Sequence, residues 1–565
     1  MTLGGLASLA VIPLLLGLDS SNLSAISSHF ATAGVDLGAS FLRMLLAYGA
    51  SLAFSIVYGY FAAVHRTGER ILIPVLDILQ SIPILGFFPI AIVFFVGLTP
   101  HSWVGPNVAS IFLIFTSMSW NMAFGVYESL KSVPVDLKEA AASFGVRGSQ
   151  RLRQLLLPAT INRLVYNSVL SWTAGWYFLV AAEIISTGSS STTLPGIGSY
   201  LLAQAANGNT NALVAGIVLL VALIAVLDFV LWRPLGRWAE KYRYDQTPSG
   251  LGDVGVSLSG RTPLRRAAHR VVRGVRSGVI LVGTPITSLA ALATAPIRAR
   301  SSSPRTRAGA FYVAVGSALI IIWLILIRLS VLAYGILTGP IDPGIAGDIR
   351  LLPLAVVNSF GRILVAYTLS LAIALPLAAV LARRPRVARV GLPVVEIVAS
   401  VPATALFPLF IFALAGVPFI GFQGAAILML VTGMVWYLFF NLLSGLRAIP
   451  PDLEEAAQSF CLPRRQYYRR VMLPAVIPAL ITGSITAFGG GWNALVLAEY
   501  LKYGTHQLSV LGVGELIDKG NFATGSSGLP LMVSALLTLV IVVVAVNELI
   551  WKPLYRRAVE RYRYD

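Results

Sequence analysis

Long apolar segments constrain the fold of this chain more than any other feature. Several runs approach the roughly 20 residues with which an α-helix crosses a lipid bilayer, and the clearest lie at 311–337, 361–381 and 531–551. Of the 565 residues, 56% are hydrophobic and only 12% are charged, which is about half the charged fraction of a typical soluble domain. The sequence therefore predicts an all-α protein that crosses a membrane many times.

The second half of the chain repeats the first. At an offset of 319 positions, Arg43 aligns with Arg362 and Asp77 with Glu396; after a short loop the offset becomes 316, and Glu183 aligns with Glu499. Such internal repeats are typical of transporters. We predict two tandem six-helix domains, 1–245 and 310–565, joined by a linker at 246–309, with about 12 membrane helices in all. These helices are expected near 3–18, 38–64, 71–96, 107–130, 155–186 and 212–234, and near 311–336, 355–382, 390–415, 423–446, 471–501 and 530–552.

The first predicted helix, 3–18, has a signal peptide as its alternative interpretation. The segment lacks the basic residues that precede the apolar core of a signal peptide, and its counterpart in the second half, 311–336, is long enough to cross a membrane. These two observations favour a membrane span.

Basic residues predict the orientation. The net charge is +18, and Lys and Arg gather in loops that would share one side, whereas the opposite loops hold only Arg350, Lys502 and Lys519. Because basic loops stay on the cytoplasmic side, we expect both termini in the cytoplasm of a cell with this protein in its inner or plasma membrane. The charge then reflects topology, and nucleic acid is not needed as a partner.

The linker at 246–309 has two interpretations. Arg266, Arg270 and Arg273 recur at helical spacing opposite an apolar face, a pattern that suits a helix lying on anionic membrane lipids. A solvated linker of no fixed structure is the alternative.

The composition argues against an enzyme. Cys461 is the only cysteine, the five histidines are scattered, and no glycine-rich loop ends in Gly-Lys-Ser or Gly-Lys-Thr. We therefore expect no metal site, no bound cofactor and no nucleotide site in this chain.

A charged segment occurs twice between the fourth and fifth predicted helices. It reads EAAASFGVRGSQRLRQLLLPA at 139–159 and EAAQSFCLPRRQYYRRVMLPA at 455–475. Each copy follows a proline and carries an acid in its first turn, which favours the start of a helix, and small residues would let another backbone approach. A short exposed helix that docks a partner is one interpretation; an ordinary amphipathic loop helix is the other.

This repeated segment resembles the signature of membrane subunits of ABC-type importers, in which Glu-Ala-Ala is followed by Gly, an aliphatic residue and Leu-Pro at fixed spacing. Cys461 takes the place of the glycine in the second copy, so we expect that turn to be built differently if the position needs a positive φ. The residues that the resemblance assigns to ATPase coupling are Glu139, Ala140, Ala141, Gly145, Glu455, Ala456, Ala457 and Cys461.

Further segments, SIPILGFFPIAIVFFVG at 81–97 and SVPATALFPLFIFALAG at 400–416, resemble the nitrate, sulfonate, taurine and bicarbonate branch of these permeases. The resemblance implies a pseudo-twofold pair of halves and alternating access driven by two copies of an ATP-binding subunit, which would hold ATP and Mg²⁺. An extracytoplasmic binding protein is a further possible partner. Another substrate or direction of ABC transport is the alternative, and a secondary transporter is less favoured because its repeats are commonly inverted.

Polar residues within the spans predict the substrate path. It would involve Ser81, Trp176, Tyr177, Ser400, Trp492 and Asn493, with packing as the alternative role of the tryptophans. We expect ion pairs between Arg43 and Glu183 and between Arg362 and Glu499, because unpaired charges at that depth are costly. Whether these pairs gate the path or brace the helices stays open. A path without an unpaired acid favours a small anion over a metal cation.

Overall fold

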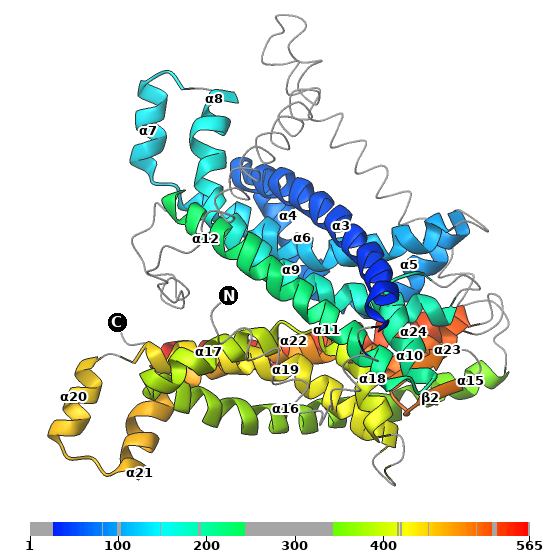
Figure 1. Ribbon diagram of the computed structural model, residues 1–565. Coiled ribbons are helices and arrows are strands. Elements are labelled where there is room, and N and C mark those ends of the chain that lie inside the picture. Colours follow the sequence, from blue (N-terminus) through cyan, green and yellow to red (C-terminus); the bar gives the residue numbers. More distant parts are fainter. Residues whose placement is uncertain are drawn as a thin grey trace, which may run out of the picture.

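The structure is a computed structural model (Figure 1) that describes residues 26, 28–81, 83–98, 103–146, 149–189, 194–242, 343–414, 417, 421–449, 451–503, 506–522 and 528–562. The predicted spans at 3–18 and 311–336 and the predicted linker at 246–309 lie outside these residues, so both interpretations of the linker stay predictions.

Helices are the regular elements among the described residues of the first half. Its helices are α3 (Phe30–Val64), α4 (Arg66–Ser81), α5 (Ile84–Leu98), α6 (Val104–Ser132), α7 (Val135–Ser143), α8 (Ser149–Arg151), α9 (Leu157–Ser189), α10 (Ile197–Ala206), α11 (Thr210–Leu227) and α12 (Arg233–Ala239). Short π-helical turns, Leu152–Leu156 and Asp228–Trp232, lead into α9 and α12, and a 3₁₀ turn, Glu240–Tyr242, follows α12.

The second half repeats this order and adds a hairpin. Its helices are α15 (Pro343–Arg350), α16 (Leu352–Arg383), α17 (Pro385–Ala399), α18 (Ala403–Leu414), α19 (Gly421–Arg447), α20 (Pro451–Ser459), α21 (Arg464–Tyr467), α22 (Leu473–Glu499), α23 (Val513–Phe522), α24 (Leu529–Val546) and α25 (Lys552–Tyr562). Strands β1 (Tyr500–Tyr503) and β2 (His506–Ser509) pair antiparallel between α22 and α23. π-helical turns, Tyr468–Met472 and Asn547–Trp551, precede α22 and α25.

Eight described helices are long and apolar enough to cross a membrane. They correspond to the second, fourth, fifth and sixth predicted helices of each half. The third helix is broken in both halves: α4 ends at Ser81 before α5 begins at Ile84, and α17 and α18 meet at an angle of 83°. The Ser-x-Pro sequences explain the break, because proline lacks the N–H group that would continue a helix.

Each half is a bundle in which the fourth helix packs between the second and the fifth: α6 lies between α3 and α9, and α19 lies between α16 and α22. Small hydroxyls tie these helices closely, since Ser55 Oγ donates a hydrogen bond to the carbonyl of Ser119 over 3.0 Å. Serine at helix contacts is common in membranes, because it permits close approach and adds a hydrogen bond.

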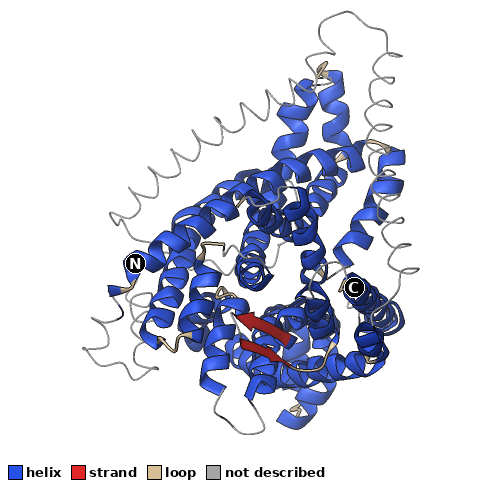
Figure 2. Cartoon of the chain, turned by 90° about the vertical axis from the view of Figure 1, so that its right-hand side faces the viewer, coloured by secondary structure: helices blue, strands red, loops and turns tan. Residues whose placement is uncertain are grey.

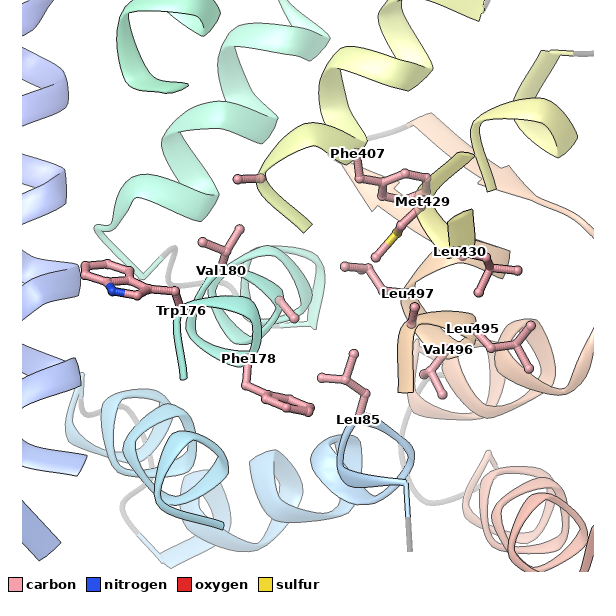
Figure 3. Packing of buried hydrophobic residues seen from close by; sticks show 14 of the residues in the cluster. Leu85, Trp176, Phe178, Val180, Phe407, Met429, Leu430, Leu495, Val496 and Leu497 are labelled. Carbon is pink, nitrogen blue, oxygen red and sulfur yellow. The ribbon is translucent and has the colours of Figure 1, made fainter. Parts of the chain in front are cut away.

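The two halves meet through the broken third helices. The second piece of each broken helix packs against the fifth helix of the opposite half: α5 packs against α22, and α18 packs against α9. Buried apolar side chains fill this contact, and Figure 3 shows Leu85 of α5 beside Val496 and Leu497 of α22. Away from this contact the halves diverge toward α7 and α20 (Figure 1).

The hairpin of the second half reaches the first half. Strand β1 packs against α9 and α10, and Figure 2 shows the two strands lying across the end of the molecule between the helices. Its residues Tyr500 and Leu501 are buried. In the first half, the described residues 184–187, which align with β1, continue α9.

Candidate functional site

A buried network of charges lies at the far end of α9 from α7. Arg43 Nη1 of α3 lies 2.6 Å from Glu183 Oε1 of α9, and both side chains are almost fully buried. The other donors of Arg43 are also used: Nε donates to Asn107 Oδ1 over 2.7 Å, and Nη2 donates to the carbonyl of Pro195 over 2.8 Å. Ser40 Oγ donates a second hydrogen bond to Glu183 Oε1.

The second half contains the same network. Arg362 Nη1 lies 2.5 Å from Glu499 Oε1, and Arg362 also donates to Gln423 Oε1 and to the carbonyl of Leu511. Ser359 Oγ donates to Glu499 Oε1 over 2.7 Å. The arginine–glutamate pairing expected from the sequence is therefore present in both halves.

The carboxylate of each glutamate also accepts a hydrogen bond from the first turn of a short helix. The N–H of Gly198 in α10 donates to Glu183 Oε2, and the N–H of Gly514 in α23 donates to Glu499 Oε2, each over 2.8 Å. A carboxylate at a helix N-terminus accepts a free N–H group and lies at the positive end of the helix dipole. A Cβ atom on Gly196 would lie 2.3 Å from the carboxyl carbon of Glu183, so this turn requires glycine.

These contacts favour bracing over gating. All partners of each pair belong to one half, and they join its second, fourth and fifth helices to the following short helix. The supporting residues Ser40 and Asn107 were not predicted, although they align with Ser359 and Gln423 at the offsets of 319 and 316. Matching polar residues across the repeat is the signal that could have found them.

The substrate-path residues lie on two different faces of the fifth helices. Trp176 is fully buried against Trp172, with ring centroids 6.3 Å apart, and Trp492 stacks on Phe360 of α16 at 6.2 Å. Both tryptophans pack inside their own half. These contacts are those expected of packing, the alternative role, and the prediction that the tryptophans line the path stays a prediction.

Tyr177 and Asn493, at equivalent positions of the repeat, instead contact the opposite half. The N–H of Ile84, freed at the start of α5, donates to Asn493 Oδ1 over 2.7 Å. Thr404 Oγ1 of α18 donates to the carbonyl of Tyr177 over 3.0 Å. The breaks in the third helices are thus held by the fifth helices across the interface.

The Tyr177 hydroxyl is buried and has no hydrogen-bond partner among the described residues. It lies within electrostatic range of Tyr437 of α19, whose side chain is 44% exposed. Ser400, at the break between α17 and α18, donates to the carbonyl of Ile397. The side chain of Ser81 lies outside the described residues, so its place in the path stays a prediction.

The Glu-Ala-Ala segments form the short helices α7 and α20, which extend beyond the helix bundles (Figure 1). Glu139, Ala140, Glu455 and Ala456 are exposed, whereas Ala141 is half-buried and Ala457 is buried. The residue that follows each helix is an exposed phenylalanine, since Phe144 is 86% and Phe460 is 78% exposed. The sequence analysis did not single out these aromatic side chains.

The turns after α7 and α20 are built in the same way, so the expectation of a different second turn is wrong. Gly145 has φ +72° and Cys461 has φ +48°. The N–H of Val146 donates to the carbonyl of Ala141, and the N–H of Leu462 donates to that of Ala457. The helix-ending hydrogen bonds therefore impose a left-handed residue even where its side chain makes that costly.

A buried acid near the hairpin has no counterpart in the first half. Asp518 of α23 is 1% exposed and its Oδ1 has no hydrogen-bond partner among the described residues; Leu202 takes this position in the first half. Burial raises the pKa of Asp518 well above its usual value. Tyr500 of β1 lies within electrostatic range of Asp518, while α5 and α24, which also pack on α23, carry no ionisable side chain.

Within the described part of the chain, no three His, Cys, Asp or Glu side chains gather closely enough to hold a metal ion. The site combines two buried arginine–glutamate networks, an interface built on broken helices, and two exposed short helices, α7 and α20. This combination defines a membrane transport protein made of two repeated halves.

Comparison with known proteins identifies the family. The chain belongs to the binding-protein-dependent transport system inner membrane components, which match residues 55–232 and 371–557, once in each half. The chain is 28% identical over 202 residues to the taurine transport system permease protein of Escherichia coli (strain K12), covering 36% of this chain and 66% of that protein. It is 33% identical over 112 residues to the nitrate import permease protein of Leptolyngbya laminosa, covering 20% and 38%.

A bicarbonate transport system permease protein of Synechococcus elongatus is 25% identical over 201 residues, covering 35% of this chain and 67% of that protein. These relatives confirm the predicted branch of ABC importer permeases, with two permease domains in one chain, and a multi-pass inner-membrane location.

The buried brace predicts a large effect of removing one charge. We expect Glu183→Gln to destabilise the protein by about 3–5 kcal/mol, because Arg43 is left buried without its counter-charge. Glu128→Gln is the matched control: Glu128 pairs with Arg163 on the surface, and such pairs contribute at most about 1 kcal/mol. Thermal unfolding of the purified protein measures both, and equal shifts would contradict the bracing role.

The two turns predict opposite effects of exchanging their residues. Cys461→Gly should stabilise its turn and Gly145→Ala should destabilise the other by about 1 kcal/mol each, because a left-handed residue with a side chain is strained. Nothing lies within 4 Å of a Cβ built on Gly145, so strain is the only expected cause. Hydrogen exchange of α7 and α20 measures both, and slower exchange after Gly145→Ala would exclude this explanation.

Asp518 predicts a pH-dependent stability. Since burial raises its folded pKa above the unfolded value, its contribution is full at low pH and is lost as the pH rises through the raised pKa. The unfolding temperature should therefore fall toward alkaline pH, and Asp518→Asn should reduce that fall. Unfolding temperatures across a pH series test this; identical profiles of the two proteins would disprove it.

Proposed function

We propose that the two halves of the chain together form the membrane pathway of an ATP-driven importer of a small anion. Two copies of a separate ATP-binding subunit would dock on α7 and α20 and would hold ATP and Mg²⁺. Their closure would draw the two docking helices together and rock the halves between inward-open and outward-open states. Both termini would lie in the cytoplasm, as the basic loops predict.

The duplicated docking helices carry this proposal. Both extend from the same side of the molecule (Figure 1), and both present a glutamate, an alanine and a terminal phenylalanine to solvent. Exposed aromatic side chains of this size are typical anchors of protein interfaces. Because the two surfaces share these residues, two copies of one subunit fit them better than two different subunits.

The nature of the substrate is inferred from the interface and the relatives. Among the described residues, the contacts of Tyr177 and Asn493 involve hydroxyl, amide and backbone groups, and both buried acids of the fifth helices are neutralised by arginine. Neutral polar groups without a negative field favour an oxyanion over a cation. The relatives are named for taurine, nitrate and bicarbonate, and we propose a small anion of this kind here.

An uptake experiment tests the proposal. Vesicles containing this chain, the ATP-binding subunit encoded nearest to it and any neighbouring binding protein should take up labelled nitrate, bicarbonate or a sulfonate when ATP is present. Glu139→Arg should reduce uptake at least tenfold, because it reverses a charge on the docking surface, while leaving the amount of folded protein unchanged.

Glu128→Arg is the control for that substitution, since Glu128 is also exposed but lies on α6 outside the docking surface. Transport of a cation or sugar with no anion would contradict the substrate class. ATP-driven export would contradict the direction, and full uptake by Glu139→Arg would contradict the coupling surface.

A further inference from the structure

Among the side chains that the structure describes, one ion pair connects the two halves. Arg233 at the start of α12 lies with Nη2 3.3 Å from Glu396 Oε2 of α17. The same guanidinium lies 2.7 Å from Asp228 Oδ2 of its own helix and 4.2 Å above the ring of Phe229. Arg233 and Glu396 are 37% and 30% exposed, so water reaches the pair.

This pair lies away from the main contact between the halves. The apolar interface is formed by α5 and α18 with the opposite fifth helices. In Figure 1, α12 and α17 face each other on the side where the halves diverge toward the docking helices. Of the salt bridges between described residues, Arg233–Glu396 is the one that joins the halves.

The partners of Arg233 make the cross-half contact easy to break. When Glu396 moves away, Arg233 keeps Asp228 and the ring of Phe229, so it is not left as an isolated charge. Glu396 is already partly hydrated, and half-exposed pairs contribute little compared with buried ones. The contact can therefore open and close without the large penalty that would attend the buried pairs of the fifth helices.

The charges also follow the repeat. Glu396 aligns with Asp77 and Arg233 aligns with Lys552 at the same offset of 319, and Trp232 and Trp551 precede the two cations. Each half therefore places an acid on its third helix and a base at the end of its sixth. Lys552 pairs with Glu548 in its own helix.

We propose that Arg233 and Glu396 form an ionic latch that sets how far the two halves separate on the side of the docking helices. The pair stabilises the conformation described here and opens when the halves move relative to each other. This role goes beyond the proposed anion import, because it holds for any substrate and acts without the ATP-binding subunit.

The distance between the docking helices reports this role. Cys461 is the only cysteine of the chain and is exposed after α20. Ser143→Cys adds a second exposed thiol at the last residue of α7, two residues before Gly145, the position equivalent to Cys461; the serine hydroxyl there donates to the carbonyl of Glu139. Spin labels on both thiols of the full-length chain in lipid nanodiscs give the distribution of distances between α7 and α20.

We expect Glu396→Gln to change the ratio of short to long distances about two- to fivefold, the range that a partly exposed pair can produce. Raising the salt concentration should change the distance distribution of the protein with Glu396 intact in the same direction, because salt screens the ion pair. Glu396→Asp keeps the negative charge that faces Arg233, and it should therefore leave the distribution closer to the original one than Glu396→Gln does.

Glu128→Gln is the matched control, because Glu128 and Arg163 lie 2.7 Å apart at similar exposure but within one half. It should leave the distances unchanged. A distribution unaffected by Glu396→Gln, an equal change in Glu128→Gln, or a change in Glu396→Asp as large as in Glu396→Gln would each overturn the latch. A failure of anion uptake would leave these distances unaffected, so the two proposals fail separately.

Discussion

The burial of two arginine–glutamate pairs is the constraint on which each half depends. Charges inside a membrane protein cost several kcal/mol each unless their partners are in place. Arg43 and Glu183 obtain those partners from four helices and one turn, and Arg362 and Glu499 do so again. Because no partner can leave without exposing the others to this cost, each network makes its half a rigid unit.

The interface between the halves is built from weaker contacts. Each broken third helix offers its start to the opposite fifth helix, and single hydrogen bonds at Asn493 and Thr404 join them. Apolar packing fills the remainder and can slide without leaving a charge unpaired. Rigid halves joined by such an interface favour motion between the halves over motion within them.

Sequence reasoning predicted the features that have a strong local or periodic cause. The eight described spans follow from apolar length, the breaks from Ser-x-Pro, and the ion pairs from the cost of burying charge. The helices α10 and α23 were missed because they have ten residues and begin at a carboxylate distant in sequence. The tryptophans were assigned to the path because the seven-residue spacing places Trp176 and Glu183 on one face of a helix. Spacing does not show what that face contacts.

The differences between the halves are unevenly distributed along the molecule. At the docking end, even the left-handed turn is kept when its glycine is replaced, so Cys461 accepts strain that Gly145 avoids. At the opposite end, the strand β1 aligns with helical residues of α9, and the buried Asp518 aligns with Leu202. Two copies of one docking subunit require two similar surfaces, whereas a single substrate entering between the halves meets both at once and requires no symmetry. We therefore infer that the halves are alike where each would bind its own copy of a subunit. They differ where both would meet a single substrate.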